Sequence, residues 1–176
     1  RYTKYSSRKK PEKANIIQNL ASHAFSIIPG LLDSNQSPLF TVAAILENNK
    51  PAPLQSADQA KFHLSYSNPD CLQGAEVEVH VGWGQQNMSK LTIEGAKENI
   101  RIYFQKHGSI EKGTLRSGYT WVQTPHSNPP LEQQYRSILA NPSFANNEIS
   151  AHLHTAQLLD KATSLAQQWH QQNLGN

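Results

Sequence analysis

The stretch from Ala75 to Phe104 constrains the fold most, because its apolar residues recur at every second position. Residues 75–83 read AEVEVHVGW, so Val77, Val79 and Val81 would share one face of a strand. Residues 90–94 and 99–105 repeat the alternation, and the short polar segments between the three runs suit antiparallel connections. The sequence therefore predicts antiparallel strands with one buried and one exposed face.

Two further strands are expected beside these three. Residues 61–66, KFHLSY, alternate in the same way. After residue 104 we expect a turn over residues 108–113 (GSIEKG) and then a last strand over residues 114–124, broken by Gly118. The expected sheet is a five-stranded antiparallel meander.

Helices are expected on both sides of this meander in the sequence. Residues 14–28 carry an apolar stripe at helical spacing, and Pro29-Gly30 would end that helix. Ser37-Pro38 is typical of a helix start, and residues 39–48, LFTVAAILEN, are almost entirely apolar, which predicts a second, buried helix. Residues 131–139 and 147–172 predict a C-terminal pair. The expected fold class is α+β, with the meander packed on one face by N-terminal and C-terminal helix pairs.

The basic charge is concentrated at the N-terminus. Residues 1–13 contain six basic residues against Glu12, a charge of +5, whereas the rest of the chain has 10 basic and 12 acidic residues, a charge of −2. Because this segment is polar and contains Pro11, we expect a flexible basic arm over residues 1–13, followed by a single α+β domain over residues 14–176. Such an arm could neutralise nucleic-acid phosphates, flank a membrane, or be a solvated tail.

Acidic residues and histidines are weaker candidates for a functional site, in both cases one that binds a metal ion. Asp70, Glu76 and Glu78 follow the order of a metal-dependent nuclease site, although the usual lysine is missing. His152 and His154 lie on a predicted helix about 200° apart around its axis, so they cannot chelate one ion together. We expect no bound metal and no cofactor, since phosphate-binding loops and nucleophile motifs are also absent from the sequence.

A single cysteine excludes an internal disulfide and favours a reducing, cytoplasmic location. No apolar run approaches the roughly 18–20 residues that cross a bilayer. Neither observation identifies a reaction, and the oligomeric state is not indicated by the sequence.

By elimination, the expected function is a non-catalytic binding or assembly module whose partner is nucleic acid or another protein. The nucleic-acid contacts would come from basic side chains, namely Arg1, Lys4, Arg8, Lys9, Lys10, Lys13, Lys90 and Arg101. The alternatives are a nuclease or hydrolase using Asp70, Glu76 and Glu78, or the soluble domain of a membrane-anchored complex.

Overall fold

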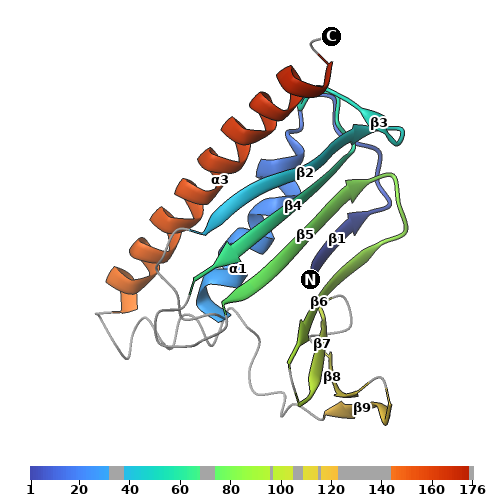
Figure 1. Ribbon diagram of the computed structural model, residues 1–176, viewed down its shortest axis with the longest axis vertical. Helices are drawn as coiled ribbons and strands as arrows, with labels where there is room; N and C mark the ends of the chain where they lie inside the picture. Colours follow the sequence, from blue (N-terminus) through green and yellow to red (C-terminus); the bar gives the residue numbers. More distant parts are fainter. Residues whose placement is uncertain are drawn as a thin grey trace.

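A nine-stranded mixed sheet forms the body of the protein in the computed structural model (Figure 1), which describes residues 1–31, 38–67, 74–95, 97–104, 109–114, 116–122 and 144–174. The strand order across the sheet is β3-β2-β4-β5-β1-β6-β7-β8-β9. The strands are β1 (Tyr2–Ser6), β2 (Leu39–Glu47), β3 (Lys50–Pro51), β4 (Gln59–Tyr66), β5 (Ala75–Trp83), β6 (Met88–Glu94), β7 (Asn99–Tyr103), β8 (Ser109–Thr114) and β9 (Gly118–Val122). The helical segments of the described residues are η1 (Ile17–Ala21), α1 (Ser22–Leu31) and α3 (Phe144–Leu174).

The prediction of a five-stranded antiparallel meander is therefore wrong. The central strand β1 runs parallel to β5 and antiparallel to β6, so the sheet is mixed and larger than expected. Alternation along the chain identified the strands but not their spatial order, because β1 enters between two strands that are consecutive in sequence.

The prediction of a flexible arm is wrong for residues 2–6, which form β1. Tyr2 lies opposite Val79 of β5 and Leu91 of β6, and only 1% of it is exposed. Residues 2–6 thus hold the two halves of the sheet together, and their one charged side chain, that of Lys4, projects from a strand instead of a mobile tail.

The prediction of a second N-terminal helix is also wrong. Residues 39–47 form β2, which pairs antiparallel with β4 and has a register shift between Val42 and Ala44. A short run of consecutive apolar residues fits a buried strand as well as a buried helix, so periodicity alone could not separate them. The expected helix over residues 131–139 lies outside the described residues.

The segment expected to be a turn after β7 is strand β8, and it pairs with β9. Its two glycines suggested the turn, but Gly113 lies inside the strand. A Cβ atom there would come within 2.0 Å of the Gly118 carbonyl oxygen, so this close strand approach requires glycine. The turn includes Arg116 and Ser117, and Gly118, five residues after Gly113, begins β9 with a φ of +76°.

The helices cover one face of the sheet. In Figure 1, α1 lies behind β2, β4 and β5, and α3 runs along the β2 side. Phe25 of α1, Phe40 of β2 and Phe62 of β4 form an edge-to-face cluster, with ring centroids 5.5–5.9 Å apart. Val79 is fully buried beside this core, as the alternation predicted.

The apolar face is not covered along its whole width. Beyond β6 the strands extend past the helices, so Ile93 is 39% exposed and Phe104 is 38% exposed. The opposite, open face of the sheet carries histidines and glutamates at its centre and exposed apolar side chains such as Leu39 and Trp121, and no helix of the described part covers it.

Candidate functional site

The basic residues that the sequence suggested do not form one surface. Lys4 lies opposite the buried Val81 and so projects to the helix-covered face. Arg1 is on the other face, where its Nε donates to Glu78 Oε2 at 2.5 Å. Arg8, Lys9, Lys10 and Lys13 follow β1, and the Lys10 ammonium donates to the Gln55 carbonyl oxygen. A continuous phosphate-binding strip is therefore absent from these residues.

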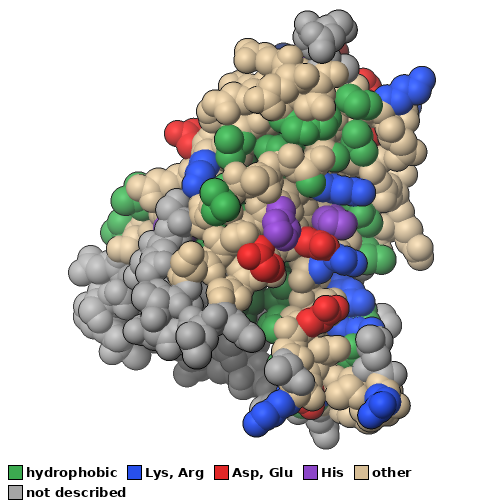
Figure 2. Space-filling model, viewed as in Figure 1, with side chains coloured by type: hydrophobic (Ala, Val, Ile, Leu, Met, Phe, Trp, Pro, Cys, Tyr) green, Lys and Arg blue, Asp and Glu red, His purple; other side chains and the backbone are tan. Residues whose placement is uncertain are grey.

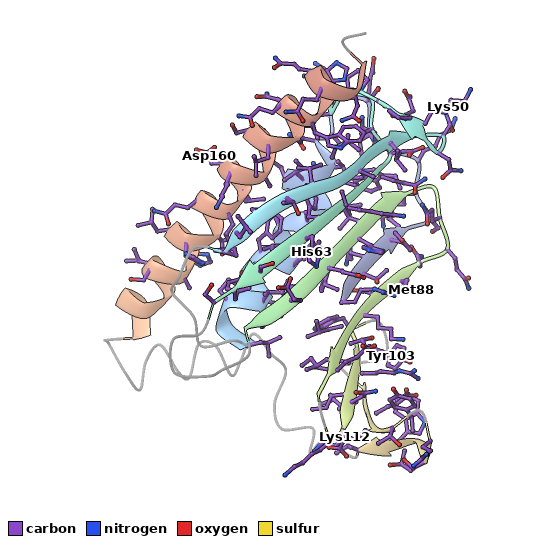
Figure 3. The ribbon with its side chains drawn as sticks, in the orientation of Figure 1. Lys50, His63, Met88, Tyr103, Lys112 and Asp160 are labelled. Carbon is purple, nitrogen blue, oxygen red and sulfur yellow. The ribbon has the colours of Figure 1, made fainter. Side chains whose placement is uncertain are left out.

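Lys90 and Arg101 lie on the polar face of the extended part of the sheet, and neighbouring side chains engage both. The Lys90 ammonium is 5.3 Å from the centre of the Tyr103 ring. The Arg101 guanidinium stacks 3.4 Å from the centre of the Tyr119 ring and lies 3.8 Å from Glu111. Tyr103, labelled in Figure 3, donates its hydroxyl to Glu111 at 3.1 Å. These contacts favour a structural role for both basic side chains.

Histidines and glutamates gather at the centre of the same face, where Figure 2 shows purple beside red and blue. His63 Nε2 lies 3.4 Å from Glu76, which also accepts a hydrogen bond from Ser65 Oγ at 2.7 Å. His80 Nε2 lies 3.6 Å from Glu78. The hydrogen bond from Arg1 lowers the pKa of Glu78, so this carboxylate stays ionised.

Within the described residues, this cluster does not provide the metal site of a nuclease. The described residues contain no group of three or more side chains placed to hold a metal ion, and Asp70 lies outside them. Each glutamate instead pairs with a basic side chain on a neighbouring strand or on its own strand. Such exposed pairs typically contribute little to stability.

A different imidazole, His23, stands out on the helical layer. It lies two residues after η1, a π-helical segment that continues directly into α1. The π geometry is rare and is frequently found at functional sites. His23 is exposed on α1, whereas its neighbours Ala24 and Phe25 are fully buried.

The surroundings of His23 disfavour the charged form of its ring. Burial of part of the imidazole lowers its pKa, and the positive charge of Lys4 on β1 lowers the pKa further. A neutral imidazole has a free ring nitrogen that can accept a proton from a hydroxyl group near neutral pH. Sequence reasoning missed this pair, because Lys4 was assigned to a mobile arm and no motif marks a π-helical turn.

None of the helices in the described ranges is both long and apolar enough to cross a membrane.

No family model matches the sequence, and no curated protein matches it either. Solved structures do match. UDP-N-acetylglucosamine 3-dehydrogenase GnnA from Acidithiobacillus ferrooxidans has a TM-score of 0.69 and 11% identity over 97% of this chain and 53% of its own. Levoglucosan dehydrogenase, in complex with NADH and levoglucosan, has a TM-score of 0.55 and 14% identity over 93% of this chain and 55% of its own. The yvaA protein of Bacillus subtilis, described as an oxidoreductase, has a TM-score of 0.54, 16% identity, and coverage of 95% and 55%.

These matches contradict the expected non-catalytic module contacting nucleic acid, because the similar structures are oxidoreductases. The expected sheet of antiparallel strands alone is contradicted by the same comparisons. At these low identities the likeness establishes the fold, and the chain spans about half the length of each structure. The chain therefore has a fold that is found within dehydrogenases about twice its length.

Proposed function

We propose that this chain is the catalytic sheet domain of an oxidoreductase that oxidises a hydroxyl group of a sugar or sugar derivative. The match of nearly the whole chain to UDP-N-acetylglucosamine 3-dehydrogenase carries the proposal. The levoglucosan dehydrogenase match supports it independently, since that protein also acts on a sugar derivative. A cytoplasmic location, suggested by the lone Cys71, is part of the same proposal.

His23 is the side chain best suited to take part in this reaction. Oxidising an alcohol requires removal of the hydroxyl proton, and a neutral imidazole is the usual side chain for this step. Lys4 lowers the pKa of His23 and would also attract a developing alkoxide. We assign proton acceptance to His23 and electrostatic support to Lys4.

The described residues do not fit a nicotinamide dinucleotide, which the levoglucosan dehydrogenase structure contains. A dinucleotide site normally combines parallel strands, crossover helices and a glycine-rich turn between a strand and a helix. Here β1 and β5 are the parallel pair of the described sheet, and Gly82 and Gly84 lead from one strand to the next. The electron acceptor would therefore be held by protein outside the described residues, and we assign it no contact in this chain.

Substrate-dependent electron transfer tests the proposal. The full-length protein that carries this chain would be incubated with NAD⁺ or NADP⁺ and a panel of monosaccharides, anhydrosugars and nucleotide sugars. Formation of the reduced dinucleotide would be followed by its absorbance. We expect turnover with at least one sugar, whereas no turnover across the panel with either dinucleotide would contradict the proposed function.

A further inference from the structure

Lys4 carries an ammonium group that forms no hydrogen bond and no ion pair with the residues that the structure describes. It lies in the middle of β1, where its register partners are Val81 of β5 and Ser89 of β6. Both partners are buried and uncharged, whereas Lys4 is half-buried. A positive charge that is partly removed from water is unfavourable unless an anionic group accompanies it.

Several basic side chains elsewhere in the described ranges do have partners. Three pair with glutamates and two donate to backbone carbonyl oxygens, namely Arg1, Arg101 and Lys112 in the first group and Lys10 and Lys161 in the second. The Lys4 ammonium therefore differs from these groups in being available to a ligand.

The elements around Lys4 supply no carboxylate to the side of the sheet on which it lies. Neither β1 nor the adjoining η1 and α1 contains an aspartate or a glutamate. On β5, Glu76 and Glu78 lie on the open face. On β6, Glu94 lies four residues after Lys90 and so shares the open face with it. Within these elements, the charge of Lys4 is not neutralised.

His23 lies over the same side of the sheet as Lys4. η1 packs against β1 and β5 and continues directly into α1, which contains His23. The charge of Lys4 acts on the His23 imidazole, so a ligand of the size of a sugar can contact both groups. Solvent reaches both residues, since His23 is exposed and Lys4 is only half-buried. The pair is therefore accessible to such a ligand.

We infer that the sugar oxidised at His23 carries an anionic group, a carboxylate or a phosphate, and that Lys4 binds this group. The inference rests on the proposed function and narrows its substrate class. An ammonium group has three donors, and its hydrogen bonds to anionic oxygens are roughly twice as strong as those between neutral groups. Lys4 is thus the residue that selects charged sugars over neutral ones.

Binding of anionic and neutral sugars to the full-length protein, with no dinucleotide present, tests the inference. The ligands are D-glucuronate, D-glucose 6-phosphate, D-glucose 1-phosphate and uncharged D-glucose, compared at constant ionic strength by isothermal titration. We expect at least one charged sugar to bind saturably and at least tenfold more tightly than D-glucose. The glucuronate and phosphate arms distinguish a carboxylate from a phosphate as the group that Lys4 binds.

The titration of His23 provides a second measurement, which requires no substitution of Lys4. A negative charge placed beside the imidazole favours its protonated form. Saturation with the charged sugar should therefore raise the pKa of His23, followed by NMR, and D-glucose should leave it unchanged. The His23 resonance is identified by its loss in His23→Gln.

Lys4→Gln removes the positive charge and should weaken binding of the charged sugar about 10- to 100-fold, the effect of one lost hydrogen bond to a charged group. Lys61→Gln is the matched control, because Lys61 is a half-buried lysine of β4 that lies opposite His80 on the open face. Its affinity should stay within about twofold of wild type. Melting curves verify that both variants are folded.

Four results would overturn the inference: no saturable binding of a charged sugar up to about 50 mM, equal affinity for D-glucose, an unchanged His23 pKa at saturation, or wild-type affinity in folded Lys4→Gln. Failure of the proposed function is a different result. Charged sugars that bind through Lys4 without being oxidised would contradict the reaction alone, whereas turnover of neutral sugars only would contradict the role of Lys4 alone.

Discussion

Replacing Tyr2 with alanine tests whether the N-terminal residues form an ordered central strand or a mobile arm. The Tyr2 ring is 1% exposed and contacts Phe104, with ring centroids 6.2 Å apart. Its hydroxyl hydrogen-bonds with the side chain of Ser89, which is also buried. Tyr2→Ala would remove these contacts and leave a void between β5 and β6, and the Ser89 hydroxyl would lose its partner.

The expected loss follows from the size of the ring. Truncating a buried aromatic side chain to alanine destabilises a protein by about 3–5 kcal/mol. For a chain of this length, each kcal/mol corresponds to about 2–4 °C in melting temperature. Tyr2→Ala should therefore melt about 6–20 °C below wild type. If residues 1–6 were mobile, the same substitution would change almost nothing.

The measurement is thermal unfolding followed by circular dichroism at pH 7. Tyr5→Ala is the matched control, since Tyr5 lies on the same strand but is only half-buried on the open face. It should cost about 1 kcal/mol. A Tyr2→Ala protein that melts within about 2 °C of wild type would refute the central position of β1.

Three further outcomes follow from burial and charge. Val79→Asp places an unpaired charge in the core and should cost several kcal/mol, measured by urea unfolding; a small change would contradict the assigned core. Burial raises the pKa of Tyr66 to about 12, from an ordinary value of 10.0. Tyr66 ionises at lower pH in the unfolded chain, so the free energy of unfolding should fall as the pH rises between these values. Tyr66→Phe should make that slope smaller. Lys4→Gln removes a positive charge and should therefore raise the pKa of His23, which NMR titration measures. An unchanged pKa would show that Lys4 does not act on His23.

The strands of the chain centre could be predicted from alternation alone. Val77, Val79 and Val81 are buried on one face, and Glu76 and Glu78 lie on the other. A period of two indicates which face of the sheet each residue occupies, and the face determines whether the residue is buried. The same pattern contains no information about which strands are neighbours.

The errors have identifiable physical causes. β1 was hidden because its buried apolar residue, Tyr2, lies among basic residues that project to either face of the sheet. β2 was mistaken for a helix because its consecutive apolar residues show no clear period. Gly113 looked like a turn residue, whereas it permits close contact between β8 and β9.

The candidate site was not predictable from spacing in the sequence. His23 and Lys4 are far apart along the chain and interact electrostatically because η1, which continues into α1, packs against β1 and β5. Pairs of this kind arise from topology, which local patterns do not encode.

The turnover of a His23→Gln variant tests the central claim most directly. The rate of sugar oxidation would be measured in the full-length protein, with the sugar and dinucleotide that give the fastest reaction, and compared with His63→Gln on the open face. Loss of a proton acceptor should lower kcat of His23→Gln by about 100-fold or more, whereas His63→Gln should stay within about twofold of wild type. Equal activity of His23→Gln and wild type would contradict the assignment of this chain as the catalytic domain acting through His23.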